Sequence, residues 1–376
     1  MTVMQPPADR RIVLPDVTAP VSPTAPKPEE DKPRALRVRS ADDVLSFVGS
    51  LLGSLALVWL IYFQILPLSG VLGFIICWYV AFLALYAGVT SISHPRPVVV
   101  SRLMGTAITA AAGLVGFALA SVIVYTVVQG RLALPHLNFF THDAAGVRLQ
   151  DPLSHGGILH AIVGSLIELA IAVAVSLPLG IGTAVFMTEV GGWFAKVVRT
   201  VVEAMTAVPD LLAGLFVYVT LIVGLGMSRT GVAAAIALSV TMVPIIARSA
   251  EVSLRVVPGG LREAGLALGA SHWQTVRRVV LPTARPGLAT ALILAVARGI
   301  GETAPLLIVS GASTFFNANP LNQPMNSLPL YIFQGARSGQ PLQIQRAFGA
   351  ATVLLGIVFV LFMFTRFLAR QRVGRQ

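Results

Sequence analysis

Long apolar runs separated by short polar segments occupy most of the chain after about residue 44. A helix of roughly 20 apolar residues crosses the ~30 Å hydrocarbon core of a bilayer, and each run is long enough to do so. The pattern therefore predicts an all-α polytopic membrane protein. About eight transmembrane helices are expected, at 46–66, 70–92, 103–128, 157–187, 201–225, 230–252, 286–310 and 347–368. The fourth run is overlong and contains Pro178, which predicts a kink or an interfacial start.

The first 43 residues have a different character. They are rich in proline and in charges of both signs, a composition that predicts a disordered tail. The segment 44–94 holds the first two apolar runs and is expected to form an N-terminal transmembrane hairpin. The other six runs follow from about residue 103 to the end of the chain.

Composition supports a membrane protein. Hydrophobic residues make up 55% of the chain and charged residues only 11%, whereas soluble domains contain about 25% charged residues. The net charge of +11 could suggest a nucleic-acid partner, but the arginines lie at the ends of apolar runs. We therefore expect lipid contact and no nucleic acid. Cys77 is the single cysteine, which excludes intrachain disulfides and thiolate metal sites.

The basic residues predict the orientation of the chain. Every second connection between apolar runs is basic, and the positive-inside rule places the basic side in the cytoplasm. Both termini and the loop at 253–285 are thus predicted to be cytoplasmic. Outside that loop, the residues on this side are Arg34, Arg37, Arg39, Arg96, Arg102, Lys196, Arg199, Arg366, Arg370, Arg372 and Arg375.

The cytoplasmic loop has helical content of its own, at 259–282. Glycine at position 269 suits the C-terminal cap of a first short helix. Ser271 and Gln274 form the pattern of a capping box that opens a second helix, which we expect Pro282 to end.

The second short helix is amphipathic. Arg277 and Arg278 form a polar side, and Trp273, Val276 and Val280 form an apolar one. Such a helix can lie in the groove of a partner protein or on the membrane surface. The residues by themselves leave both interpretations open.

The same loop resembles the "EAA" loop of ABC importer permeases. The resemblance rests on Glu263-Ala264-Gly265, then Gly269, then Val279-Val280-Leu281-Pro282, with Gly265 in place of the usual alanine and Val279 in place of isoleucine. It implies a type I permease core of six helices over 103–376, with the hairpin at 44–94 as an addition. It also implies a coupling helix that docks on a cytoplasmic ATPase. The residues that would carry the coupling are Glu263, Ala264, Gly265, Gly269, Leu281 and Pro282.

A second motif, Arg298-Gly299-Ile300-Gly301-Glu302-Thr303-Ala304-Pro305, is similar to the signature of phosphate-specific permeases of the PstA type. The segments 243–248 and 328–333 resemble the same subfamily. The resemblance implies a bacterial plasma-membrane protein paired with a PstC-type permease. It further implies two PstB-type ATPase subunits, which would bind ATP and magnesium, and an external PstS-type phosphate-binding protein.

Arg298 and Glu302 are charges inside an apolar run, where they are costly and usually face a cavity or a partner. Four residues separate them, so we expect both on one helix face. An arginine fork matches phosphate oxygens, and a carboxylate accepts a hydrogen bond from protonated phosphate while repelling sulfate. We therefore predict that both line the substrate pathway. The alternative is a structural ion pair within one helix.

Three further charged residues lie within apolar runs. Arg248 is explained equally well as a cytoplasmic anchor and as a gate contact, and the resemblance favours the substrate pathway. Asp210 follows Pro209 and could cap a helix that restarts after a kink, at a position where the family more often has serine. Pathway roles and structural pairing both stay open for Asp210 and Glu168.

The sequence contains no P-loop, no metal-ligand spacing of histidines and no nucleophile elbow. We therefore expect no enzyme activity and no cofactor in this chain. The predicted function is the permease subunit of an ATP-driven importer of inorganic phosphate. The alternatives are a permease for another oxyanion such as sulfate or molybdate, a gradient-driven secondary transporter or channel, and a membrane sensor scaffold without transport.

Overall fold

The computed structural model describes residues 41–66 and 69–370, and every element in these ranges is helical apart from one isolated β-bridge between Gly311 and Met325. The all-α prediction is confirmed. The predicted tail lies outside the described residues except for Ala41–Asp43, which begin the first helix. The predicted basic residues Arg372 and Arg375 also lie outside them.

The chain divides into two compact units, residues 1–114 and residues 115–376. In the first unit, α1 (Ala41–Trp59) continues as the π-helical turn η1 (Leu60–Ile65), and α2 (Val71–Ser93) packs against it. The aromatic rings of Phe47, Phe82 and Tyr86 join the two helices, with centroids 5.4 to 5.9 Å apart. The boundary between the units falls inside α3 (Arg96–Gly130).

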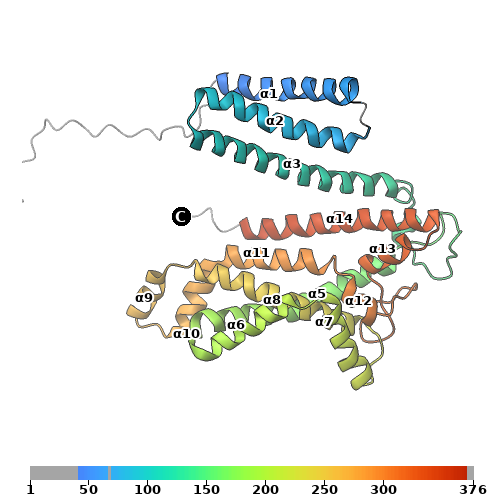
Figure 1. Cartoon of the computed structure of the whole chain (residues 1–376). Coiled ribbons are helices and arrows are strands. Elements are labelled where there is room, and N and C mark those ends of the chain that lie inside the picture. The colour runs from blue at the N-terminus through green and yellow to red at the C-terminus, as the bar shows by residue number, and fades with distance from the viewer. Residues whose placement is uncertain (1–40, 67–68, 371–376) are drawn as a thin grey trace, which may run out of the picture. The chain divides into compact units, whose positions relative to one another are not determined.

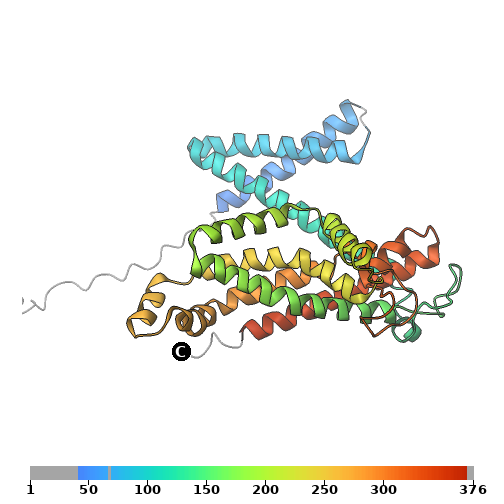
Figure 2. The ribbon, with the colours of Figure 1, turned by 90° about the horizontal axis from the view of Figure 1, so that it is seen from below.

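The second unit contains the other helices. Two groups of short helices lie at opposite ends of its long helices: α9 and α10 at one end, and α12 and α13 at the other (Figures 1 and 2). In chain order its elements are α4 (Leu137–Thr141), α5 (Leu159–Val185), η2 (Phe186–Val190), α6 (Gly192–Ala207), α7 (Asp210–Val217), η3 (Tyr218–Gly224), α8 (Gly231–Arg255), α9 (Gly259–Ala267), α10 (His272–Thr275), η4 (Val276–Val280), α11 (Leu281–Gly299), α12 (Ala304–Val309), α13 (Leu328–Ala336) and α14 (Pro341–Arg370).

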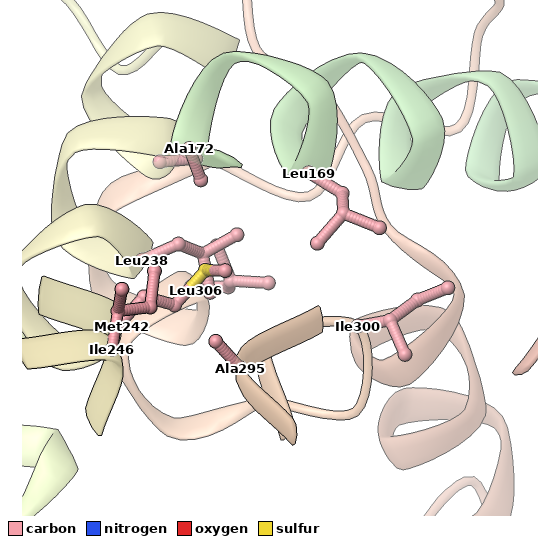
Figure 3. Close-up of a cluster of buried hydrophobic side chains, with 9 residues drawn as sticks. Leu169, Ala172, Leu238, Met242, Ile246, Ala295, Ile300 and Leu306 are labelled. Atoms are coloured by element: carbon pink, nitrogen blue, oxygen red, sulfur yellow. The ribbon is translucent and has the colours of Figure 1, made fainter. Parts of the chain in front are cut away.

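Helices α5 and α8 form the centre of this unit. A Cβ at Gly180 of α5 would lie 2.6 Å from Cγ2 of Ile246, so the helices approach more closely than alanine would allow. Small residues permit such an approach where lipid supplies no hydrophobic drive between helices. Figure 3 shows the apolar cluster that fills the space around them, formed by Leu169, Ala172, Ala234, Leu238, Met242, Ile246, Ala295, Ile300 and Leu306.

Within the described residues, seven helices are long and apolar enough to span a membrane, and the number is eight when one bent pair counts as a span. The expectation of about eight spans is confirmed. The bent pair is α6 with α7 and η3, which turn through 104° at Val208 and Pro209. The fifth predicted span, 201–225, is therefore a broken one. Proline ends the first helix there because it lacks an N–H and restricts the residue before it.

The expected end of the second loop helix at Pro282 is wrong. The helix continues from His272 through η4 and α11 to Gly299, so the seventh span begins and ends earlier than the predicted 286–310. A proline ring clashes with the carbonyl four residues before it, here that of Arg278. The backbone there is a wider π turn, η4, which leaves room for the ring without ending the helix.

Candidate functional site

Two helix breaks come together beside α8. The first, at Val208 and Pro209, separates α6 from α7. The second, at Ile300–Thr303, separates α11 from α12, and the motif with Arg298 and Glu302 spans it. Helices α7 and α12 pack directly on each other. A Cβ at Gly214 would lie 2.5 Å from Cα of Pro305, so glycine is required for this approach.

Arg298, in the last turn of α11, is the centre of an ion-pair cluster. Its Nη2 donates to Oδ2 of Asp210 at 2.6 Å, and its Nε lies 3.1 Å from Oε1 of Glu302. Arg298 and Glu302 are thus in contact, but the expectation that both lie on one helix face is wrong, because α11 ends at Gly299 and Glu302 lies in the break that follows. Asp210 does not cap α7 with its side chain; it joins the arginine instead.

The three charged side chains differ in exposure. The Arg298 side chain is 52% exposed, that of Asp210 is 29% exposed and that of Glu302 is 14% exposed. The arginine is positioned by close packing of the next residue, because a Cβ at Gly299 would lie 2.7 Å from Sδ of Met242 in α8. The cluster therefore combines a half-exposed cation with two less accessible carboxylates.

A cavity of about 380 Å³ opens beside this cluster, and Arg298 and Asp210 are the charged residues among those that line it. A water molecule takes ~30 Å³ of the liquid, so the cavity can hold an oxyanion together with several waters. The lining comes from α6, α7, α8, α11 and the first break: Met205, Thr206, Val208, Asp210, Leu212, Ala213, Phe216, Val240, Thr241, Pro244, Ile245 and Arg298.

Arg248 lies elsewhere. Its Nη1 contacts Glu203 of α6 at 3.2 Å and Glu251 of α8 at 3.1 Å. Glu251 also accepts hydrogen bonds from Arg199 at 2.8 Å and Arg255 at 2.6 Å. Among the described residues, the cavity lining does not include Arg248. The structure thus places Arg248 in an arginine–glutamate cluster that joins α6 to α8, and a pathway role for it stays a prediction.

The loop at 259–282 forms the expected helix ends. Gly269 has φ +82°, its N–H donates to Leu266 O at 2.9 Å, and Ala270 N–H donates to Gly265 O at 3.2 Å, which is a Schellman cap. The capping box is also present, with Gln274 N donating to Ser271 Oγ at 3.3 Å and Ser271 N donating to Gln274 Oε1 at 2.9 Å.

Both polar and apolar side chains are exposed on the surface of the loop 259–282. Glu263 and Ala264 are exposed, and so are the large apolar side chains of Leu266, Leu268 and Trp273. Gly265 instead faces the second loop helix, where an added Cβ would lie 3.0 Å from Thr275. Exposed apolar side chains beside a carboxylate are typical of a protein-binding surface.

A contact that the sequence analysis missed attaches this loop to α5. Glu189, buried in η2 at the end of α5, accepts from Arg262 Nη2 at 2.9 Å and from Arg262 Nε at 3.3 Å. Arg262 also donates to Val257 O at 2.7 Å and to Leu254 O at 3.0 Å. An acidic residue at the predicted cytoplasmic end of a span, where basic residues are the rule, was the available signal.

The burial of Glu168 is not explained by an ion pair or a hydrogen bond. Glu168 is buried in α5, and both of its carboxylate oxygens are without a hydrogen-bond partner among the described residues. The sequence left the roles of Asp210 and Glu168 open. Of these two residues, only Asp210 belongs to the cluster around Arg298.

Comparisons with known proteins identify the family of the chain. A solved structure titled as inward-facing conformations of the MetNI methionine ABC transporter is 24% identical, with TM-score 0.44, and covers 57% of this chain and 93% of that chain. Residues 176–374 match the family described as "Binding-protein-dependent transport system inner membrane component".

The relatives with the name "Phosphate transport system permease protein PstA" include one from Mycobacterium leprae and one from Haemophilus influenzae. The relative from Mycobacterium leprae is 37% identical over 250 residues, which are 65% of this chain and 82% of the relative. The relative from Haemophilus influenzae is 32% identical over 246 residues, which are 65% of this chain and 85% of the relative. The chain belongs to the family of binding-protein-dependent transport system inner-membrane components, as an ABC permease of the PstA type.

Proposed function

We propose that the chain is the permease subunit of an ATP-driven importer of inorganic phosphate. Its relatives from Mycobacterium leprae and Haemophilus influenzae are named as phosphate transport system permeases, which supports this substrate. The observation that carries the proposal is Arg298, a half-exposed guanidinium on the wall of a cavity between broken helices. A charge at such a place is by default functional, and the planar guanidinium fork matches phosphate oxygens.

The proposed assembly follows the same family. A PstC-type permease would form the other half of the pore. Two PstB-type ATPase subunits would bind ATP and magnesium. The exposed face of 259–282, with Glu263, Leu266, Leu268 and Trp273, would dock on those ATPases. An external PstS-type protein would deliver phosphate to the opposite end of the second unit, near α12 and α13. Both termini would be cytoplasmic.

Uptake of radiolabelled phosphate tests the proposal. Phosphate-starved bacteria that lack this chain would be complemented with it, with excess sulfate or molybdate as competitor. Restored uptake that neither anion reduces supports phosphate. Uptake that sulfate or molybdate abolishes indicates another oxyanion. Restored uptake without a copurifying ATPase indicates a gradient-driven transporter, and no uptake with the protein present in the membrane indicates a scaffold.

Replacing Glu302 by glutamine is expected to reduce the discrimination against sulfate. The carboxylate repels an anion without a proton, and the amide does not. Loss of one such repulsion, about 1.4 kcal/mol, corresponds to about a tenfold stronger inhibition of phosphate uptake by sulfate. The matched control is Glu203→Gln, a half-exposed carboxylate that contacts Arg248. Equal sulfate inhibition in wild type and Glu302→Gln would contradict the assigned role.

The pair of Glu189 and Arg262 is expected to transmit movement from the coupling loop to α5. Reversing one charge, in Glu189→Arg or Arg262→Glu, should lower the number of phosphates imported per ATP hydrolysed several-fold, because two like charges then face each other. The double reversal should recover part of the loss, since only the backbone contacts of Arg262 remain missing. ATP hydrolysis and uptake measured together in proteoliposomes would check this. Single and double variants with the same ratio would refute the coupling role.

A further inference from the structure

The ion pairs of Arg298 involve one edge of its guanidinium. A guanidinium binds an oxyanion best with two adjacent N–H groups, and the groups on Nε and Nη2 form one such edge. Asp210 occupies Nη2 of Arg298 and Glu302 occupies Nε. Two carboxylates from different segments thus lie where one bidentate oxyanion would bind this edge, while the other edge, with Nη1, has no ion pair among the described residues.

The charge of the cluster also disfavours an anion. With Asp210 and Glu302 ionised, one positive and two negative charges give a local net charge of −1 on the cavity wall. Like charges in a partly desolvated site repel each other strongly. An arriving anion is therefore repelled by the cluster, and it has to displace a carboxylate to bind the edge of Nε and Nη2.

Asp210 is the carboxylate that can leave. Glu302 lies only four residues from Arg298 in the chain and is the less exposed of the two. Asp210 comes from 88 positions away, lies at the start of a separate helix and lines the cavity. Movement of α7 away from α11 would separate Asp210 from Arg298, whereas Glu302 is attached to Arg298 by the short connecting segment.

The packing shows which parts can move together. Helices α7 and α12 contact each other closely through Gly214 and Pro305. A break separates each from the preceding helix: Val208 and Pro209 after α6, and Ile300–Thr303 after α11. Adjacent breaks in two packed helices are the usual arrangement of a hinge, since a few non-helical residues absorb the change in backbone angles.

The helices that precede the two breaks, α6 and α11, are both joined to α8. Helix α6 is joined to it by ion pairs of Arg199 with Glu251 and of Glu203 with Arg248. Helix α11 is joined to it by the close packing of Gly299 on Met242. Arg298 thus lies before the second break, and Asp210 lies in the pair α7–α12. This pair packs on α8 through the apolar cluster of Val217, Ala233, Ala237 and Val309, with no ion pair to α8 among the described residues.

We propose that Asp210 is a carboxylate latch, which occupies Arg298 when phosphate is absent and is released as the pair α7–α12 moves and phosphate binds. The latch rests on the proposed function, because it assumes that the competing ligand is phosphate. Between transport cycles, the latch lowers the affinity of the cavity for anions. It also makes Asp210 a determinant of specificity, since an anion has to compete with a carboxylate for the same N–H groups.

Equilibrium binding of radiolabelled inorganic phosphate to the purified transporter, with all its subunits and without ATP, tests the latch. Asp210→Asn should bind phosphate about tenfold or more tightly than wild type, because the competing charge-assisted hydrogen bond is weakened. Asp210→Glu, which keeps the charge, should stay near wild type. A purely structural role for Asp210 would weaken binding rather than strengthen it, so the sign of the change separates the two.

A second variant addresses the same contact without altering a charge. Gly214→Ala inserts a methyl group between α7 and Pro305 and should draw Asp210 away from Arg298, which would tighten phosphate binding in the same direction by a smaller factor. Arg131→Ala, in an exposed turn after α3, is the control and should leave binding unchanged.

The outcomes are distinguishable. If wild type imports phosphate while Asp210→Asn and Gly214→Ala bind it no more tightly than wild type, the latch is overturned and the proposed function stands. If wild type neither imports nor binds phosphate, both are overturned.

Discussion

Replacing Arg298 by alanine is expected to abolish phosphate uptake. The substitution removes two charge-assisted hydrogen-bond donors to the anion, each worth about 1.5–3 kcal/mol, so uptake should fall by about 100-fold or more. It also leaves Asp210 and Glu302 without the cation that they share. The cavity wall then carries two uncompensated negative charges, which repel the substrate.

Uptake measured in complemented cells, with the amount of protein in the membrane determined in parallel, checks this expectation. Arg298→Lys should retain a minor part of the activity, because lysine keeps the charge but not the planar fork. Arg131→Ala controls for the loss of an arginine outside the cavity and should transport as wild type does. Uptake by Arg298→Ala at more than a tenth of the wild-type rate would rule out the assigned role.

The second large effect is expected at Glu251, where a replacement by glutamine should destabilise the folded protein by about 3 kcal/mol. The Glu251 side chain is 1% exposed and accepts from Arg199, Arg248 and Arg255. Removing its charge leaves Arg199 and Arg255 without a counter-ion among the described residues, and leaves Arg248 with Glu203 alone. The value is at the low end for a broken buried ion pair, because the arginines are partly exposed and can turn toward water.

Glu203→Gln is the matched control for this prediction. Its side chain is 53% exposed and contacts only one of the same arginines, Arg248, so its loss should change stability by about 0–1 kcal/mol. Thermal unfolding of the purified proteins, followed by intrinsic fluorescence, compares the two. A clearly lower unfolding temperature is expected for Glu251→Gln alone. Similar unfolding temperatures for the two variants would show that the cluster is not a structural joint between α6 and α8.

The sequence by itself determined the features that depend on neighbouring residues. The apolar runs predicted about eight spans, because hydrophobic length is a local property. The ends of the loop helices at Gly269 and at Ser271 with Gln274 followed from capping chemistry, which acts over three or four residues. The closeness of Arg298 and Glu302 also follows from their spacing of four positions, although the single helix face expected for them is not formed.

Rules based on neighbouring residues did not predict where one helix continues past a proline, or how sharply another one bends. Pro282 was expected to end a helix, yet the backbone widens into a π turn and α11 continues. At Pro209 a kink was foreseen, but not a turn of 104°, whose size depends on the packing of α7 against α12.

Tertiary structure alone decided which distant charges meet. Arg298 contacts Asp210, Glu189 contacts Arg262, and Arg199 contacts Glu251. The partners are separated by 88, 73 and 52 positions in the sequence, respectively. In each sequence segment the partner could equally have been water, lipid headgroups or another helix. Ionic partners inside a membrane protein are chosen by the packing of whole helices, which single-segment patterns do not contain.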